Sequence, residues 1–122
     1  MGSSKFLNLV VLISILGNGV QAICDLQSIE INQTTTGETV EGMPQYEVEI
    51  KNSCICTQLD VTLDCAGFIT VQPIEPAIIR MDGEKCIVKD GLPIHFNDVI
   101  KFNYAWDSTF VFVPISSQIA CS

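Results

Sequence analysis

The stretch CICTQLDVTLDC, residues 54–65, contains three of the six cysteines and predicts the fold. From Leu59 to Cys65, apolar and polar side chains alternate strictly. Successive side chains of a strand point to opposite faces of its sheet. The pattern therefore predicts a strand whose inward face carries Leu59, Val61, Leu63 and Cys65. Asp60, Thr62 and Asp64 then lie on the face toward solvent.

The cysteines of this stretch have two interpretations. They can form structural disulfides, or they can form a thiolate metal site or redox site. A zinc site needs about four ligands in close pairs, and Cys54-x-Cys56 is a close pair without a good second one. We therefore expect disulfides and no metal ion.

The N-terminus favours the disulfide interpretation. One basic residue, Lys5, precedes an apolar run over residues 6–16, and Val20-Gln21-Ala22 ends with small residues at the positions that a signal peptidase reads. The run is shorter than the about 20 residues of a transmembrane helix. We expect a signal peptide at residues 1–22 and a secreted, extracellular domain at residues 23–122.

The cysteines all lie in that domain: Cys24, Cys54, Cys56, Cys65, Cys86 and Cys121. An even number in a small secreted chain indicates a disulfide framework, here of about three bridges, although sequence does not choose among the connectivities. We expect Cys24 and Cys121 to tie the chain ends to the body. Cys54 and Cys56 lie two apart on an expected strand, so we expect them to bond to different partners.

Short strands account for the rest of the chain. Alternation predicts strands over residues 24–31, 46–51, 85–89 and 100–106, with a polar turn region at 35–43 and a hairpin-type turn at Asp90-Gly91. Residues 109–113 are apolar on both faces, which predicts an inner strand. Pro73 and Pro76 indicate an edge strand or irregular crossing over residues 69–79. The sequence predicts an all-β fold, a small antiparallel β-sandwich stapled by disulfides, with a small barrel as the alternative.

Charge and motifs limit the function. The net charge of −8 disfavours nucleic acid and anionic membranes as partners. Asn32-Gln33-Thr34 is a glycosylation sequon. His95 is the single histidine, and no nucleophile elbow, calcium loop or cofactor motif accompanies it. We expect no enzyme activity and no cofactor.

The aromatic residues near the C-terminus leave an alternative open. Phe102, Tyr104 and Trp106 alternate along one expected strand. They can fill the core, or they can form an exposed platform that stacks on sugars. The second arrangement would make the protein a carbohydrate-binding or cell-wall-binding module without catalytic activity.

A series of short motifs runs through the mature region. They are Cys54-x-Cys56, Val61-x-Leu63-x-Cys65-x-Gly67-Phe68, Cys86-x-Val88, Asp90-Gly91-x-Pro93-Ile94, Phe102-x-Tyr104-Ala105-Trp106 and Ser116-Ser117 to Cys121. In this order they resemble the plant tapetum determinant family of small secreted cysteine-rich proteins. The resemblance implies an apoplastic signalling protein that is a ligand of a leucine-rich-repeat receptor kinase and acts in cell differentiation.

An acidic ligand can recognise a basic patch on a receptor ectodomain. The candidate residues for this contact are Asp60, Asp64, Asp82, Glu84, Asp90 and Trp106. The mechanism would be surface complementarity without chemistry.

Overall fold

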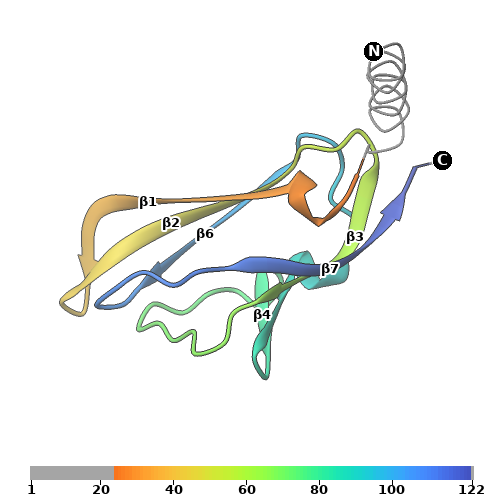
Figure 1. Cartoon of the computed structure of the whole chain (residues 1–122). Helices are drawn as coiled ribbons and strands as arrows, with labels where there is room; N and C mark the ends of the chain where they lie inside the picture. Colours follow the sequence, from red (N-terminus) through yellow and green to blue (C-terminus); the bar gives the residue numbers. More distant parts are fainter. Residues whose placement is uncertain (1–23, 122) are drawn as a thin grey trace, which may run out of the picture.

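The computed structural model describes residues 24–121, so the expected signal peptide at residues 1–22 lies outside the described residues. Strands β1 (Ile29–Val40), β2 (Met43–Asn52) and β6 (Val99–Ala105) form one antiparallel sheet in the order β1-β2-β6 (Figure 1). A second antiparallel sheet has the order β4-β5-β3-β7. Its strands are β3 (Thr57–Asp64), β4 (Ile79–Asp82), β5 (Lys85–Val88) and β7 (Val113–Ala120). Two short 3₁₀ turns, η1 (Leu26–Ser28) and η2 (Lys89–Gly91), complete the regular elements.

One hydrophobic core lies between the two sheets. The first sheet contributes Val48, Ile50 and Tyr104, and the second contributes Leu63 and Val88, all fully buried. The two open sheets that share this core confirm the sandwich expected from the sequence.

The first hairpin is longer than the sequence predicts. The polar region at residues 35–43 was expected as a turn, yet β1 continues to Val40 and the turn is confined to Glu41 and Gly42. Both turn residues have positive φ, 50° and 79°, as a type I′ turn requires. The N-terminal end is shorter than expected: residues 26–28 form η1, because Asp25 Oδ1 accepts the Gln27 and Ser28 amides.

The alternation over residues 59–65 is interrupted in β3, which corrects the expected position of Leu59. Gln58 is fully buried and Leu59 only half-buried, while Val61, Leu63 and Cys65 face the core as expected. The cause is Asp60, which has φ of 53° at a shift in the pairing with β7. A bulge at this position changes the phase of the alternation by one residue.

Residues 109–113 do not form the inner strand that their composition predicts. Phe112 is buried and Phe110 half-buried, whereas Val111 is 79% exposed. Side chains replace the hydrogen bonds of a sheet here. The Phe110 N–H donates to the Tyr104 hydroxyl at 3.0 Å, and the Gln33 amide donates to the Phe110 carbonyl. Regular structure begins only at Val113, in the edge strand β7.

Residues 89–94 cross between the sheets, so the hairpin expected at Asp90-Gly91 is wrong. Lys89, Asp90 and Gly91 have φ of 55°, 54° and 80°, and this left-handed turn redirects the chain. Ile94 then pairs with Gln58 through two backbone hydrogen bonds of 2.7 and 3.0 Å before the chain enters β6.

Three disulfides join the chain, Cys24–Cys54, Cys56–Cys121 and Cys65–Cys86. Both terminal cysteines are tied to the body, and Cys54 and Cys56 bond to different partners, as expected. Cys54 and Cys56 themselves lie in a bend between β2 and β3 and not on a strand. The buried amides of Asn52 and Gln58 lie beside them. Asn52 donates to the carbonyls of Cys56 and Ile94, both at 2.9 Å, and accepts from Cys54 and Gln58.

An aromatic cluster fills the other end of the core. The ring of Phe68 packs edge-on against Tyr104, Phe110 and Phe112 with centroids 5.2 Å apart in each pair. The ring centroids of Tyr46 and Tyr104 lie 5.3 Å apart. Burial raises the pKa of the Tyr104 hydroxyl above its usual 10.0, and the hydrogen bond from Phe110 opposes this in part.

Candidate functional site

Five of the six candidate partner-binding residues lie on the outer side of the second sheet. Asp60 and Asp64 are on β3 and Asp82 is the last residue of β4. Glu84 lies in the turn between β4 and β5, and Asp90 lies in η2. All five side chains are exposed. The fold therefore brings together acidic residues that are distant in sequence.

Basic side chains stand between these carboxylates, which the sequence alone did not reveal. In the backbone register, Lys85 on β5 is paired with Asp82 of β4 on one side and with Asp64 of β3 on the other, so it occupies a position between two acidic residues. Arg80, in the next row of the sheet, donates to Asp90 Oδ1 at 3.2 Å. We call this surface the mixed-charge face: Asp60, Asp64, Asp82, Glu84 and Asp90 with Arg80, Lys85 and Lys89.

The hairpin turn could have revealed one of these neighbours. Residues that flank a two-residue turn pair directly across it. Asp82 and Lys85 flank Gly83 and Glu84, and Gly83 has φ of 64°. The position of Arg80 beside Asp90 has no such local signal, because it depends on the left-handed turn at η2.

Asp60 and η2 fit together closely. A methyl group on residue 91 would lie 2.9 Å from Asp60 Oδ1, so a larger residue there would displace the exposed Asp60 carboxylate. Lys89 anchors the same turn, because its amide donates to the Ile78 carbonyl at 2.8 Å and its ammonium group donates to the Pro93 carbonyl at 2.9 Å. Non-glycine residues with positive φ cost of order 1 kcal/mol each and persist where their surroundings hold them. The fold thus holds Asp60 and Asp90 in defined positions.

Most of the acidic excess lies elsewhere. The mixed-charge face contains five of the 14 acidic residues and three of the six basic residues. The outer side of the first sheet carries Glu30, Glu47 and Glu49, and Lys101 contacts Glu49 at 3.5 Å. A partner of the mixed-charge face would therefore meet alternating charges, which specify orientation more than they add affinity.

Trp106 does not belong to this face. It follows β6 in the first sheet, is half-buried, and its backbone N–H donates to the Pro44 carbonyl at 3.3 Å. Tyr104 and Phe102 are buried in the core. The described residues therefore offer no row of exposed rings of the kind that a sugar-stacking platform needs.

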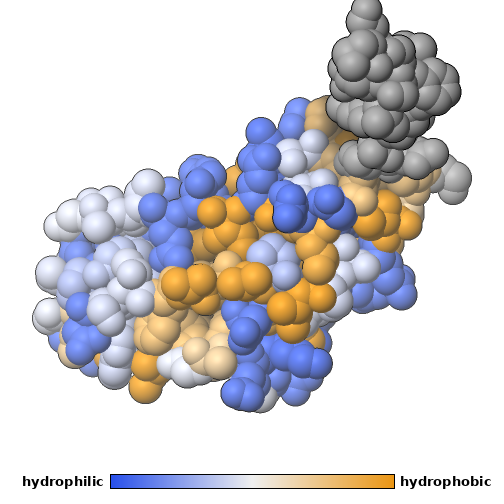
Figure 2. Space-filling view, in the orientation of Figure 1, coloured by the Kyte–Doolittle hydropathy of each residue, from blue (hydrophilic) through white to orange (hydrophobic). Residues whose placement is uncertain are grey.

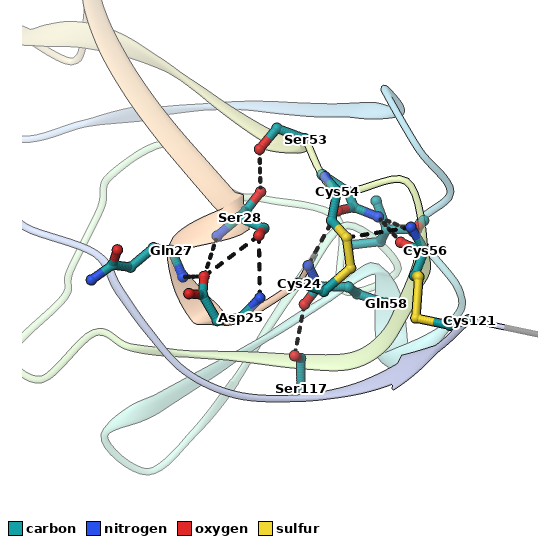
Figure 3. The surroundings of a disulfide bond; sticks show 12 residues. Cys24, Asp25, Gln27, Ser28, Ser53, Cys54, Cys56, Gln58, Ser117 and Cys121 are labelled. Carbon is teal, nitrogen blue, oxygen red and sulfur yellow. Dashed lines mark hydrogen bonds between the residues drawn. A yellow bond between two sulfur atoms is a disulfide. The ribbon is translucent and has the colours of Figure 1, made fainter. Parts of the chain in front are cut away.

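The sulfur atoms of Cys24, Cys54 and Cys56 lie within 4.8 Å of one another (Figure 3). This proximity is that of two adjacent disulfides, because every one of the six cysteines is bonded to another. Bonded sulfur atoms do not provide the thiolates that a metal ion or a redox site requires.

The described residues do not assemble a catalytic constellation around His95. His95 is exposed, and its Nδ1 lies 3.1 Å from the Thr57 hydroxyl.

A groove of about 390 Å³ beside β4 has an apolar lining apart from Thr70 and Arg80, and the Thr70 hydroxyl accepts the Ala105 N–H at 3.0 Å. Catalytic pockets instead gather several convergent polar groups. In residues 24–121 no helix is both long and apolar enough to cross a membrane.

Asn32 is exposed on β1 and lies on the outer side of the first sheet, opposite Glu49. Thr34, the third residue of the sequon, is exposed as well. Both recognition residues of the sequon are therefore on the surface.

Comparison with known proteins matches nearly all of the described chain. The family model described as "Tapetum determinant 1, C-terminal" matches residues 25–122. TPD1 protein homolog 1 of Arabidopsis thaliana is 30% identical over 112 residues, which cover 87% of this chain and 62% of that protein. TPD1 protein homolog 1B of Oryza sativa subsp. japonica is 28% identical over 100 residues, covering 80% and 58%.

A third relative matches over nearly its full length. An uncharacterized protein of Arabidopsis thaliana is 30% identical over 123 residues, which cover 96% of this chain and 95% of that protein. The chain spans about three fifths of the length of the two relatives named as TPD1 homologs. No solved structure matches it. Because the family model covers residues 25–122, this chain belongs to the tapetum determinant 1 family.

Proposed function

We propose that this protein is a secreted plant signalling protein that acts in cell differentiation as a ligand of a leucine-rich-repeat receptor kinase. The observation that supports the proposal most is the family match over residues 25–122. Three disulfides and a surface without a catalytic constellation in the described residues are compatible with a ligand that works by binding.

The mixed-charge face is the surface that we assign to the receptor. The β3 bulge and the left-handed turn at η2 define the backbone positions of Asp60 and Asp90, and the Arg80–Asp90 pair links two of the charged groups. Fixed charges reduce the conformational entropy that is lost on binding. Receptor groups would meet carboxylates at Asp60 and Asp64, with Lys85 excluding a uniformly basic partner surface.

The test is a binding titration of the mature protein against a panel of receptor kinase ectodomains. The double variant Asp60→Lys/Asp64→Lys should bind the cognate ectodomain roughly tenfold more weakly, which corresponds to about 1.4 kcal/mol. Glu30→Lys/Glu47→Lys is the matched control, since it changes the net charge equally on the first sheet. Equal weakening by both variants would reject the mixed-charge face, and an absence of binding to every ectodomain would reject the receptor proposal.

Secretion and glycosylation are part of the same proposal. We expect the protein isolated from the apoplast to begin at Ile23, after removal of residues 1–22. The exposed Asn32 should carry a glycan, so an amidase that removes N-linked glycans should lower the mass of the native protein and leave Asn32→Gln unchanged. An N-terminus at Met1 in the extracellular protein would contradict the signal peptide.

A further inference from the structure

A sandwich of two open sheets has four edge strands, which here are β1, β6, β4 and β7. Each edge presents unpaired backbone N–H and C=O groups that can pair with another chain. Soluble proteins protect such edges with charge, short length, proline or covering loops. Comparison of the four edges shows which of them lacks this protection.

Three edges are protected. β1 carries Glu30 and Glu38 together with the Asn32 sequon. β4 has four residues, among them Arg80 and Asp82. β6 carries Lys101, and the segment between β3 and β4 covers its end, where the Val71 N–H donates to the Ala105 carbonyl at 3.0 Å.

The fourth edge, β7, differs. It is the one described strand without a charged residue, and the uncharged stretch continues from Ser108 to the end of the chain. One side of β7 pairs with β3. Among the described residues, no backbone hydrogen bond outside the sheet involves β7. Pro114 is the one protective residue within the strand, and η1 lies against part of β7.

Apolar side chains follow this open edge. Val111, Val113, Ile115 and Ile119 are all exposed, from 40% to 79%. Figure 2 shows hydrophobic residues gathered across this side of the molecule, along β7 and toward β1. An uncharged backbone template and an apolar strip thus coincide on one edge.

The charge of the chain indicates what can cover this edge. With a net charge of −8, two copies repel one another wherever their acidic surfaces meet. At β7 they would meet without bringing like charges together. An uncharged edge also offers no electrostatic selectivity for a charged foreign segment, whereas a second copy supplies the same apolar strip to pack against.

We propose that β7 pairs antiparallel with β7 of a second copy, which forms a two-fold symmetric dimer with one continuous eight-stranded sheet. A symmetric contact uses the same residues from both copies. Pro114 has no N–H, so pairing would extend over residues 115–120, up to the bridge at Cys121. The dimer goes beyond the receptor-ligand proposal and leaves the mixed-charge face of each copy accessible.

The experiment is sedimentation velocity on the mature, disulfide-bonded protein over a wide concentration range. As the protein concentration rises, the sedimenting mass should increase from that of one copy to that of two. Ile115→Glu would bring a carboxylate into the apolar strip opposite Ala120 of the second copy and should weaken dimerisation at least tenfold, because the charge would lose its water without gaining a partner. Val99→Glu is the matched control, because Val99 is 43% exposed on β6 and Ile115 is 40% exposed on β7. A protein that stays monomeric, or equal weakening by both variants, would overturn the proposal.

Hydrogen exchange supplies a measurement that does not depend on the folding of a variant. In the wild-type protein, amides of residues 115–120 should exchange more slowly as the concentration rises, while those of β1 should not change. A dimer whose protection appears on β1, or whose β7 amides keep the exchange rate of the monomer, would overturn the pairing through β7.

Discussion

Strand β2 joins two ends of the sandwich that are held together in different ways. At its last residue, Asn52, lies the bridged end, where Cys24–Cys54 and Cys56–Cys121 surround the buried amides of Asn52 and Gln58 (Figure 3). Near its start lies the aromatic end, formed by Tyr46, Phe68, Tyr104, Phe110 and Phe112. The bridged end relies on covalent bonds and hydrogen bonds, and the aromatic end on packing.

This small domain divides its sources of stability between its two ends. Disulfides act mainly by restricting the unfolded chain, whereas ring packing acts in the folded state. The bridged end also carries both chain termini of the described region, where fraying would otherwise begin. The aromatic end contains no terminus, and its long hairpin closes through a two-residue turn.

Loss of the Cys56–Cys121 bridge should have the largest effect. Its cysteines lie 65 residues apart, and closing such a loop is worth about 4 kcal/mol in the chain-entropy model. Cys56→Ala/Cys121→Ala should lower the free energy of unfolding by that amount in a urea titration. Cys24→Ala/Cys54→Ala, with a separation of 30, should cost about 0.7 kcal/mol less by the same relation. The reverse order would show that packing, not loop length, governs the bridged end.

Phe68→Ala tests the aromatic end and should rank next. The ring is buried and contacts three others, so its removal leaves a cavity and should cost roughly 3 to 4 kcal/mol in the same titration. Ile69→Ala is a control on the adjacent residue, which is exposed and should change little. A small loss for Phe68→Ala would mean that the aromatic end can collapse around the missing ring.

Asn52→Leu tests whether the buried amides, apart from the bridges, stabilise the bridged end. It leaves the Cys56 carbonyl, the Cys54 N–H and the Gln58 side-chain amide without the partner that Asn52 supplies, which should cost about 3 kcal/mol. Adding Gln58→Leu removes one of the orphaned groups. The double variant should therefore lose less stability than the sum of the single variants, and simple additivity would argue against a coupled network.

Tyr104→Phe should have the smallest effect, about 1 to 2 kcal/mol at neutral pH, because it removes the hydroxyl that bonds Gln33 and Phe110. The raised pKa of Tyr104 also predicts a pH dependence. The folded protein favours the neutral hydroxyl, so this stabilisation is complete below the usual pKa of 10.0 and is lost as the pH rises through the folded-state pKa. In urea titrations at pH values between 10.0 and the folded-state pKa, the variant should lose stability less steeply than the wild type. If the free energy of unfolding fell equally steeply with pH in both proteins, burial would not be the cause of the raised pKa of Tyr104.

Sequence reasoning predicted well those parts of the fold that depend on a regular two-residue alternation. Val48 and Ile50 on β2, and Val61, Leu63 and Cys65 on β3, face the core as their spacing indicates. The prediction failed where the backbone of a single residue has a positive φ angle and so interrupts the alternation. The positive φ of Asp60 changes the phase of β3, so Gln58 and not Leu59 is buried. Apolar composition misled at residues 109–113, where side chains of Tyr104 and Gln33 take the hydrogen bonds that a strand partner would take.

The candidate site was predictable in its acidic residues but not in its neighbours. The alternation placed Asp60 and Asp64 toward solvent, and both are exposed, as are Asp82 and Glu84. Lys85 between Asp64 and Asp82 depends on the order β4-β5-β3, a long-range property that residue spacing does not encode. Trp106 separates from the acidic residues for the same reason, since β6 belongs to the other sheet.

The two disulfides at the bridged end also determine how the molecule would carry mechanical force. A pull applied at Cys24 and Cys121 passes through Cys54, Ile55 and Cys56, because these residues form the shortest covalent path between the two ends. The sandwich lies outside this path and would bear almost no tension. In a single-molecule stretching experiment the oxidised protein should therefore lengthen by only a few residues, and a reductant should release the hidden length of the whole domain.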